Sequence, residues 1–403
     1  MKRVLNITIL ITIAVSTLYI SLDQPQVITS NDAVIHCEIM APTIRNNLNP
    51  YMHENLVQSD MREEKKDNLS NTPFNHIPTL NTLLLILCNE TEANWFNLYP
   101  YFLVFAFSFV IIFISKISTQ PLPYSLFFIS IGNGVYQSIR SGNLSSFAFL
   151  FLVLSCYLVL KEKYLSGGIL YSIYCLYRIT PLVVILLLLF FVSNKKARDF
   201  LKGFAYMFIP AILYSVLFQT VLLRDWFFRV LIPESISNRF NESLSEGRQV
   251  LGDNILGDYF DIPSVLNLIH YLNRFSLALA ILLSVFFIFS FSKLFLSLNK
   301  VEFGIDALLA LNILHLAITP YFRSYHMIEL SFIITIWLIR NRDEFPMEYW
   351  VFPLSLYLGT YIKSLDGDTL YVLLFNDLSA PLFLLFFFSQ LLYEDLKKKS
   401  RID

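Results

Sequence analysis

Long apolar segments, separated by short charged or proline-containing stretches, constrain this chain more than any other feature of its sequence. A run of about 20 apolar residues crosses a bilayer as a helix, because lipid offers the backbone no other hydrogen-bond partners. Only 15% of the residues are charged, whereas a soluble domain carries about 25%. The pattern therefore predicts an all-α polytopic membrane protein with a single integral membrane domain over residues 1–403. About 12 candidate transmembrane helices lie near residues 4–22, 97–117, 124–139, 143–160, 165–178, 180–193, 201–219, 275–298, 304–319, 326–339, 348–363 and 378–393.

Three segments need separate interpretation. Residues 1–22 combine a basic start with a long apolar stretch and no small-residue cleavage site, so we interpret them as an uncleaved first helix. The apolar run 164–192 is too long for one helix. Because Pro181 disfavours helical geometry in the residue before it, we expect two helices with a break at Arg178. Segment 77–88 is too short to span a bilayer, and we place it as an interfacial helix on the outer surface.

The distribution of lysine and arginine predicts the orientation of the chain. With the N-terminus inside, most of the 30 basic residues fall in short inside loops, as the positive-inside rule requires. Both termini are then cytoplasmic, and the long loops 23–96 and 220–274 are extracytoplasmic. The short outer turns retain only four basic residues, Arg140, Arg178, Arg323 and Lys363.

Arg178 is the only charged residue in the apolar run from Tyr164 to Val192. An ionisable side chain at membrane depth costs roughly 2.5–3.5 kcal/mol on insertion scales, so it indicates a functional site by default. Several cations on the outer face would suit an anionic ligand, for which a lipid phosphate is the first candidate. The alternative is an arginine that only extends its side chain to the lipid headgroups.

Short elements follow one another along the chain in a recognisable order. The first outer loop opens NDAVIHCEIMAPTIRNNLNPYMHENL, with Asp32 and an Asn-Pro-Tyr element at 49–51, and later come SIRSGNLSSFAFLFLVL, LYRITPLVVILLLLFFVSNKKARDF and ITPYFRSYHMIEL. This series resembles glycosyltransferase family 87, whose members use polyprenyl-phosphate sugars and have the GT-C membrane fold. The family includes bacterial mannosyl- and arabinofuranosyltransferases. The resemblance covers roughly residues 1–340 and implies a GT-C-type bundle with two long outer loops.

The sequence departs from the family pattern at several of these elements. The tyrosine usual four residues after the aspartate is His36, and the glycine-glutamine pair is Gly142-Asn143. The entry to segment 77–88 is His76-Ile77-Pro78, and the late element carries the single histidine His326. These departures leave open a divergent member, or one that has lost activity.

The resemblance implies transfer of a mannose-like hexose or arabinofuranose to a glycan or glycolipid acceptor at the outer face of the cytoplasmic membrane. It implies a catalytic Asp32, which can take the proton of the attacking hydroxyl, and a single displacement with inversion. Cations near the lipid phosphate would stabilise the charge on the leaving group. The candidates for the donor phosphate are Arg178, Arg323, His326 and Arg140, and those for the acceptor are Tyr51, Asn143 and His36. No cofactor is certain and a divalent metal stays open, and the net charge of −1 gives no reason to expect a nucleic-acid partner.

Two other functions stay open at this point. A transporter or flippase of lipid-linked sugars would also use outer cations, but it should show internal repeats and ionisable residues at the membrane midplane. We find no convincing repeat. A polymerase or ligase of surface polysaccharide shares the large outer loops, but it would not need an aspartate just after the first helix. Asp32 can equally be an ordinary loop residue, and His326 a histidine at a helix start that is hydrogen-bonded to the backbone.

Several further expectations concern the loops and cysteines. Cys156 and Cys175 should be small buried hydrophobic side chains, whereas Cys37 and Cys88 can pair if both face an oxidising compartment. Loop 53–72 is polar and should be solvated. In the second long loop, Trp226, Phe227 and Phe228 should face lipid, and residues 247–258 are a candidate lid over the acceptor.

Overall fold

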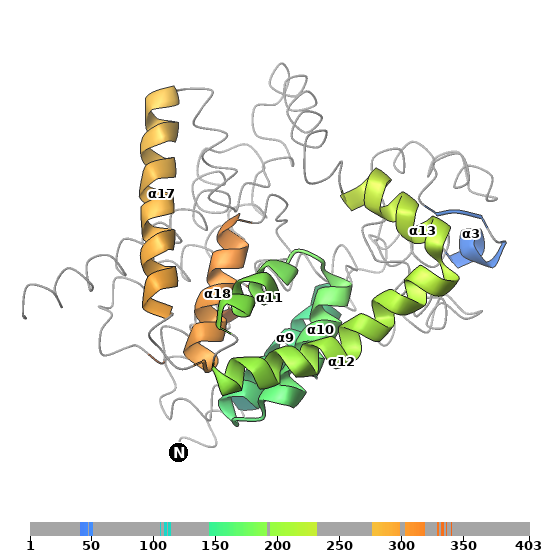
Figure 1. Ribbon diagram of the computed structural model, residues 1–403, viewed down its shortest axis with the longest axis horizontal. Helices are drawn as coiled ribbons and strands as arrows, with labels where there is room; N and C mark the ends of the chain where they lie inside the picture. The colour runs from blue at the N-terminus through green and yellow to red at the C-terminus, as the bar shows by residue number, and fades with distance from the viewer. Residues whose placement is uncertain are drawn as a thin grey trace, which may run out of the picture.

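The structure is a computed structural model. It describes residues 41–46, 48–50, 105, 109–110, 112–113, 145–191, 194–231, 276–298, 303–318, 329, 332–333, 336 and 340. Within these residues every regular element is a helix (Figure 1), as the sequence predicts. The longer helices are α9 (Ser145–Leu160), α10 (Tyr164–Tyr177), α12 (Lys195–Phe218), α17 (Leu277–Leu298) and α18 (Ile305–Ile318). The shorter ones are α3 (Ala41–Arg45), α11 (Leu182–Leu188) and α13 (Thr220–Asp225). A 3₁₀ turn, Leu189–Phe191, follows α11, and a π-helical turn, Trp226–Leu231, follows α13.

The boundaries of α9, α10, α17 and α18 lie within two residues of the predicted apolar segments. The break inside the long apolar run is also where proline predicts it. Helix α10 ends at Tyr177, Arg178 has extended backbone angles (φ −132°, ψ 116°), and Pro181 precedes the first residue of α11. The ring of Pro181 and its lack of an N–H therefore set the end of one helix and the start of the next.

Helix α12 begins six residues before the predicted start at 201, and this boundary was wrong. The side chain of Asn194 accepts hydrogen bonds from the backbone N–H groups of Lys196 (2.9 Å) and Ala197 (3.5 Å). An asparagine in this position starts a helix by satisfying N–H groups that have no partner within it. Lys195, Lys196 and Arg198, which the sequence places in an inside loop, therefore form the first turn of the helix.

In the described part of the chain, α12 is the one helix that is both long and apolar enough to cross a membrane. It is 24 residues long and crosses the front of Figure 1 from the end of α9 toward α13. Large apolar side chains are exposed along much of it, including Tyr206, Leu213 and Phe218. Exposed apolar surface of this extent on a helix is what contact with lipid requires.

Helices α9, α10 and α12 pack against one another at glycines. A Cβ atom on Gly168 would lie 2.0 Å from the backbone oxygen of Phe200, and one on Gly203 would lie 1.9 Å from that of Leu165. These glycines therefore allow the backbones of α10 and α12 to approach more closely than any side chain would permit, as small residues do in membrane helix pairs. On the other side of α10, the Ser155 hydroxyl donates a 2.8 Å hydrogen bond to the carbonyl of Gly167.

Helix α18 is buried from Ala307 to Leu316 and contacts α9 and α11. The ring of Phe200 lies 5.4 Å from that of Phe303, just before α18, and 5.6 Å from that of Tyr171 on α10. Cys156 and Cys175 are free and buried, as expected. The described core is built from aliphatic, aromatic and small side chains, contributed mainly by α9, α10, α12 and α18.

The beginning of the second long loop differs from the sequence prediction. Residues 220–231 are helical, and Trp226, which we expected to face lipid, is only 4% exposed. Phe227 and Phe228 are exposed. The buried carboxylate of Asp225 accepts a 2.6 Å hydrogen bond from the amide of Asn49. This bond joins α13 to the Asn-Pro element of the first loop, an interaction between distant segments that local periodicity does not reveal. Segment 77–88, loop 53–72, residues 247–258, Cys37 and Cys88 lie outside the described residues.

Candidate active site

The break after α10 carries a buried ion pair. The Nη1 atom of Arg178 donates to the Oε2 atom of Glu329, a residue 151 positions later in the chain. The side chain of Arg178 is 10% exposed and that of Glu329 is 0% exposed. An arginine that only extended to the headgroups would leave its guanidinium in the polar interface. Arg178 instead turns inward toward a carboxylate.

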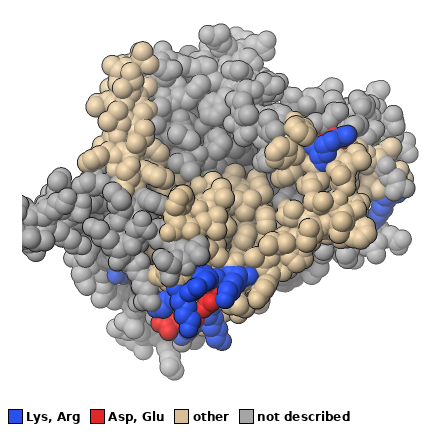
Figure 2. All heavy atoms as spheres, viewed as in Figure 1, with Lys and Arg blue, Asp and Glu red and all other residues tan. Residues whose placement is uncertain are grey.

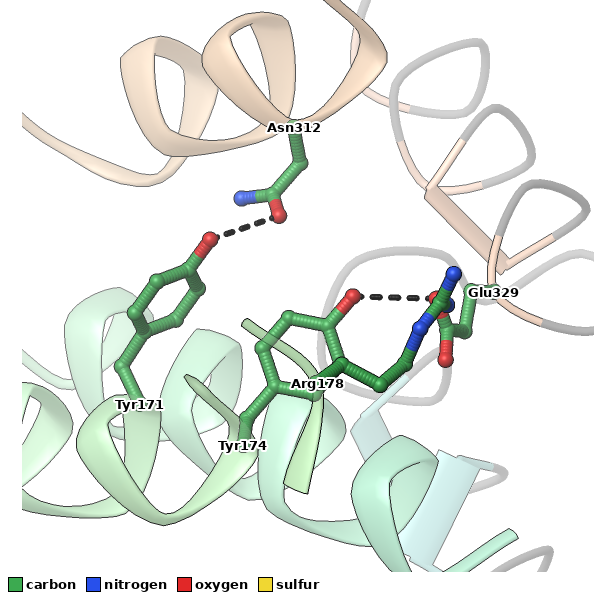
Figure 3. A network of polar contacts seen from close by, with 5 residues as sticks. All are labelled: Tyr171, Tyr174, Arg178, Asn312 and Glu329. Atoms are coloured by element: carbon green, nitrogen blue, oxygen red, sulfur yellow. Dashed lines mark hydrogen bonds and ion pairs between the residues drawn. The ribbon is translucent and has the colours of Figure 1, made fainter. Parts of the chain in front are cut away.

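A tyrosine one turn earlier on α10 contacts the same carboxylate. The hydroxyl of Tyr174 donates a 2.9 Å hydrogen bond to Oε2 of Glu329, so one oxygen accepts from two donors (Figure 3). Residues 174 and 178 are spaced i, i+4, which places them on the same face of a helix. We refer to Tyr174, Arg178 and Glu329 as the charged cluster.

A second, uncharged contact lies beside the charged cluster. The hydroxyl of Tyr171 donates a 2.9 Å hydrogen bond to Oδ1 of Asn312 on α18 (Figure 3). The Nδ2 atom of Asn312 in turn donates to the carbonyl of Leu308 at 2.8 Å. Tyr171 and Asn312 are both 0% exposed. We refer to these two residues as the neutral pair.

Two buried side-chain oxygen atoms at the break have no hydrogen-bond partner within the described structure. They are Oε1 of Glu329 and Oγ1 of Thr180. A buried polar atom without a partner costs about 1–3 kcal/mol, and more when it is charged. His315, also 0% exposed, lies one turn after Asn312 on α18. The break is therefore a polar, charged region inside an otherwise apolar bundle.

A cluster of basic residues lies at the opposite end of α10, while Arg45, Arg224 and Lys293 belong to α3, α13 and α17. Figure 2 shows a blue surface at the turn between α9 and α10 and at the start of α12. With 14 residues, α10 separates this end from Arg178 by about 20 Å. The described basic residues of this surface are Lys161, Lys163, Lys195, Lys196, Arg198 and Lys202. The orientation predicted from the charge bias stays a prediction.

Of the predicted site residues, only Arg178 belongs to the described part of the chain. Asp32, His36, Tyr51, Arg140, Asn143, Arg323 and His326 lie outside it. Asn49, the first residue of the Asn-Pro-Tyr element, donates a hydrogen bond to Asp225. The position of Asp32 relative to Arg178 stays untested.

Glu329 was missed by the sequence interpretation, although the sequence contains a signal for it. It is a carboxylate in the apolar segment 326–339, and an ionisable residue in such a segment should be treated as functional, with an opposite charge sought as its partner. The same rule had already identified Arg178 as a cation that needs a partner.

Metal binding finds no support in this region. No group of three or more histidine, cysteine, aspartate or glutamate side chains gathers in the described ranges. The divalent metal that the sequence leaves open stays untested.

Comparison with known proteins gives one match. The family model described as Glycosyltransferase family 87 matches residues 92–312, which is more than half of the chain. The matched range includes α9 to α18 up to Asn312, and therefore the break at Arg178. No curated protein and no solved structure matches the chain.

Proposed function

The chain belongs to glycosyltransferase family 87, and on that premise we propose that it takes its sugar from a polyprenyl-phosphate donor. The family makes it a membrane glycosyltransferase, which favours an enzyme over a transporter or flippase. The proposed acceptor is a glycan or glycolipid at the outer face of the cytoplasmic membrane, and the proposed sugar is a mannose-like hexose or arabinofuranose. A surface-polysaccharide polymerase or ligase is the remaining alternative.

The buried guanidinium of Arg178 is the main observation that supports a lipid-phosphate donor. A planar guanidinium matches the oxygens of a phosphate with paired hydrogen bonds, and it stays charged when removed from water. It lies at a helix break, where the α10 carbonyl end has a partial negative charge that a cation stabilises. A phosphate carried on a lipid can approach such a site from the bilayer, whereas the sequence shows no loop that would bind a nucleotide.

In the proposed reaction, Asp32 takes the proton of an acceptor hydroxyl, whose oxygen attacks the anomeric carbon of the donor sugar. The bond from that carbon to the phosphate oxygen breaks, and the lipid phosphate leaves with the electron pair. Arg178, Arg323, Arg140 and His326 stabilise the charge on the leaving phosphate. Only three positions separate His326 from Glu329, so the chain keeps their Cα atoms within about 11 Å. Tyr51, Asn143 and His36 are proposed to contact the acceptor.

The test is transfer from a defined donor. Membranes containing the protein are incubated with a polyprenyl-phosphate sugar labelled in the sugar, and parallel samples receive the nucleotide sugar. We expect label in an acceptor fraction from the lipid donor only. Asp32→Asn should reduce transfer by about 10²–10⁴ without loss of the protein from the membrane, because a general base is removed.

Each component of the proposal can fail separately. Transfer from the nucleotide sugar alone would overturn the donor class, and near-normal turnover of Asp32→Asn would remove Asp32 from the mechanism. For the orientation, cysteines are introduced at positions 60 and 397 and labelled from outside the cell. Position 60 should react and position 397 should not, because both termini are proposed to be cytoplasmic.

A further inference from the structure

We infer that Glu329 is a positioning residue for the donor phosphate, because together with Tyr174 it fixes the guanidinium of Arg178 at the break between α10 and α11. The inference rests on the proposed function, in which Arg178 contacts that phosphate. It assigns to Glu329 an indirect role, since the carboxylate would repel the phosphate if the two were in direct contact.

The geometry restricts the arginine on two sides. Its backbone is fixed in the extended conformation that follows the last turn of α10, and its N–H still donates to the carbonyl of Tyr174. Its far end is fixed by Glu329 through Nη1. Arg178 therefore has its charge at a set position before any ligand arrives, and the entropic cost of immobilising a long side chain does not fall on donor binding.

Tyr174 fixes the carboxylate in turn. Its hydroxyl donates to the oxygen that Arg178 also contacts, and Tyr174 itself is 0% exposed. Glu329 is thus held by Tyr174 of α10 and by Arg178, the residue that caps the C-terminus of this helix. A guanidinium carries five N–H groups, so one that is bound to a carboxylate through Nη1 can also bind an oxyanion through its other nitrogens. The same contact that orients Arg178 is therefore compatible with its proposed contact with phosphate.

The charge of Glu329 also matters for keeping the site intact. A buried cation without a counterion is strongly unfavourable, and a paired one is tolerated. Glu329 allows a guanidinium to remain charged and inward-facing at membrane depth. A purely structural ion pair would do the same, so the decisive measurement is one that a structural role does not change.

The experiment measures binding of polyprenyl phosphate, without sugar, to the purified full-length protein in detergent, and KM and kcat for the sugar-loaded donor. Glu329→Gln keeps the size of the side chain and removes its charge. We expect roughly a tenfold or larger increase in the Kd for polyprenyl phosphate and in the KM for donor, the scale of one charge-assisted hydrogen bond. The kcat should change less than about threefold, because the chemistry does not involve Glu329.

Matched variants on α10 separate positioning from general destabilisation. Tyr174→Phe removes one hydrogen bond of the charged cluster, and Tyr171→Phe removes one hydrogen bond of the neutral pair from an equally buried tyrosine. We expect Tyr174→Phe to increase the KM for donor about threefold or more, and Tyr171→Phe to leave it unchanged. If Glu329→Gln does not fold, this pair of variants still decides the question, because equal effects of the two substitutions would overturn the inference.

A double-variant cycle tests whether Glu329 acts through Arg178. In an Arg178→Gln background, Glu329→Gln should cause no further increase in the Kd for polyprenyl phosphate, since there is no guanidinium left to position. A further increase equal to that in the native background would overturn the inference, because Glu329 would then act on its own.

The proposed function and the inference fail in different ways. If the native protein neither binds polyprenyl phosphate nor uses the loaded donor, both are wrong. If the native protein binds polyprenyl phosphate and Arg178→Gln weakens that binding, but Glu329→Gln does not, the inference alone is wrong and the donor site at Arg178 stands.

Discussion

The two ends of α10 are built by different physical means. At its N-terminal end, Gly167 and Gly168 bring the helix into backbone contact with α9 and α12. At its C-terminal end, Tyr171, Tyr174 and Arg178 extend long polar side chains toward α18 and Glu329. The first end is defined by shape and the second by charge and hydrogen bonding.

This difference separates stability from function along a single helix. In membranes, helices associate chiefly through close packing, because lipid is as apolar as the side chains themselves. A glycine contact provides such packing and carries no chemistry. A buried ion pair contributes little net stability, since removing two charges from water costs about as much as their attraction returns. We therefore expect substitutions at the glycine end to remove the folded protein, and substitutions at the charged end to change donor use first.

The largest effect is expected for Gly168→Ala. The added methyl group would lie 2.0 Å from the backbone oxygen of Phe200 and 2.8 Å from the backbone nitrogen of Phe204, neither of which can rotate away. Overpacking costs about 1–3 kcal/mol when side chains can adjust, and we expect this substitution to exceed that range. The measurement is the yield of monodisperse protein after solubilisation, and its thermal unfolding.

Gly304→Ala is the matched control for this prediction, because a Cβ atom at Gly304 meets no heavy atom within 4 Å. It should give native yield. Native yield for Gly168→Ala as well would show that α10 and α12 do not pack as closely as the structure has them.

The next largest effect is expected for Arg178→Ala, which leaves the Glu329 carboxylate buried beside Tyr174 without its cation. Breaking one side of a buried ion pair costs about 3–5 kcal/mol. Donor use should also fall strongly, because the proposed phosphate contact is lost. Thermal unfolding and kcat/KM for the donor report the two losses separately.

A double substitution separates the loss of stability from the loss of donor use. Arg178→Met combined with Glu329→Leu replaces the ion pair by apolar side chains, which is often neutral or stabilising. We expect unfolding to return to near the native temperature while donor use stays low. Recovery of activity together with stability would show that the charged cluster serves folding alone.

Arg178→Lys should have an intermediate effect. Lysine keeps the charge and can pair with Glu329, but it lacks the planar fork that binds phosphate oxygens in pairs. We expect near-native thermal stability and a reduction in kcat/KM for the donor of about tenfold. Arg178→Gln should be much worse than lysine. If lysine and glutamine were tolerated equally, Arg178 would have no charge-dependent role.

The boundaries of α10 could be predicted from the sequence, but the contacts of its side chains could not. The proline at 181 acts locally, so the helix end at Tyr177 could be predicted from its chemistry. The partner of Arg178 could not be predicted from spacing, because Glu329 lies 151 residues away. The same reason explains Trp226, whose burial depends on contacts between distant segments.

The smallest effect is expected at Asn194, near the glycine end. Its side chain caps α12 by accepting from the N–H groups of Lys196 and Ala197. Asn194→Ala should lower the free energy of unfolding by about 1 kcal/mol, the usual contribution of such a cap. Asn194→Asp should restore it, because a carboxylate accepts the same hydrogen bonds and interacts favourably with the positive end of the helix.

Measuring KM for the donor in Asn194→Ala tests whether the two ends of α10 act independently. Asn194 adjoins the first turn of α12, where Nζ of Lys196 lies 5.7 Å from the ring centroid of Tyr164 at the start of α10. The length of α10 separates this end of the helix from Arg178 by about 20 Å. If the two ends act independently, KM for the donor should be unchanged in Asn194→Ala despite the lost stability. An increase in that KM comparable with the effect of Tyr174→Phe would mean that α10 transmits strain from its packed end to its charged end, so that shape and charge are not separate functions of the helix.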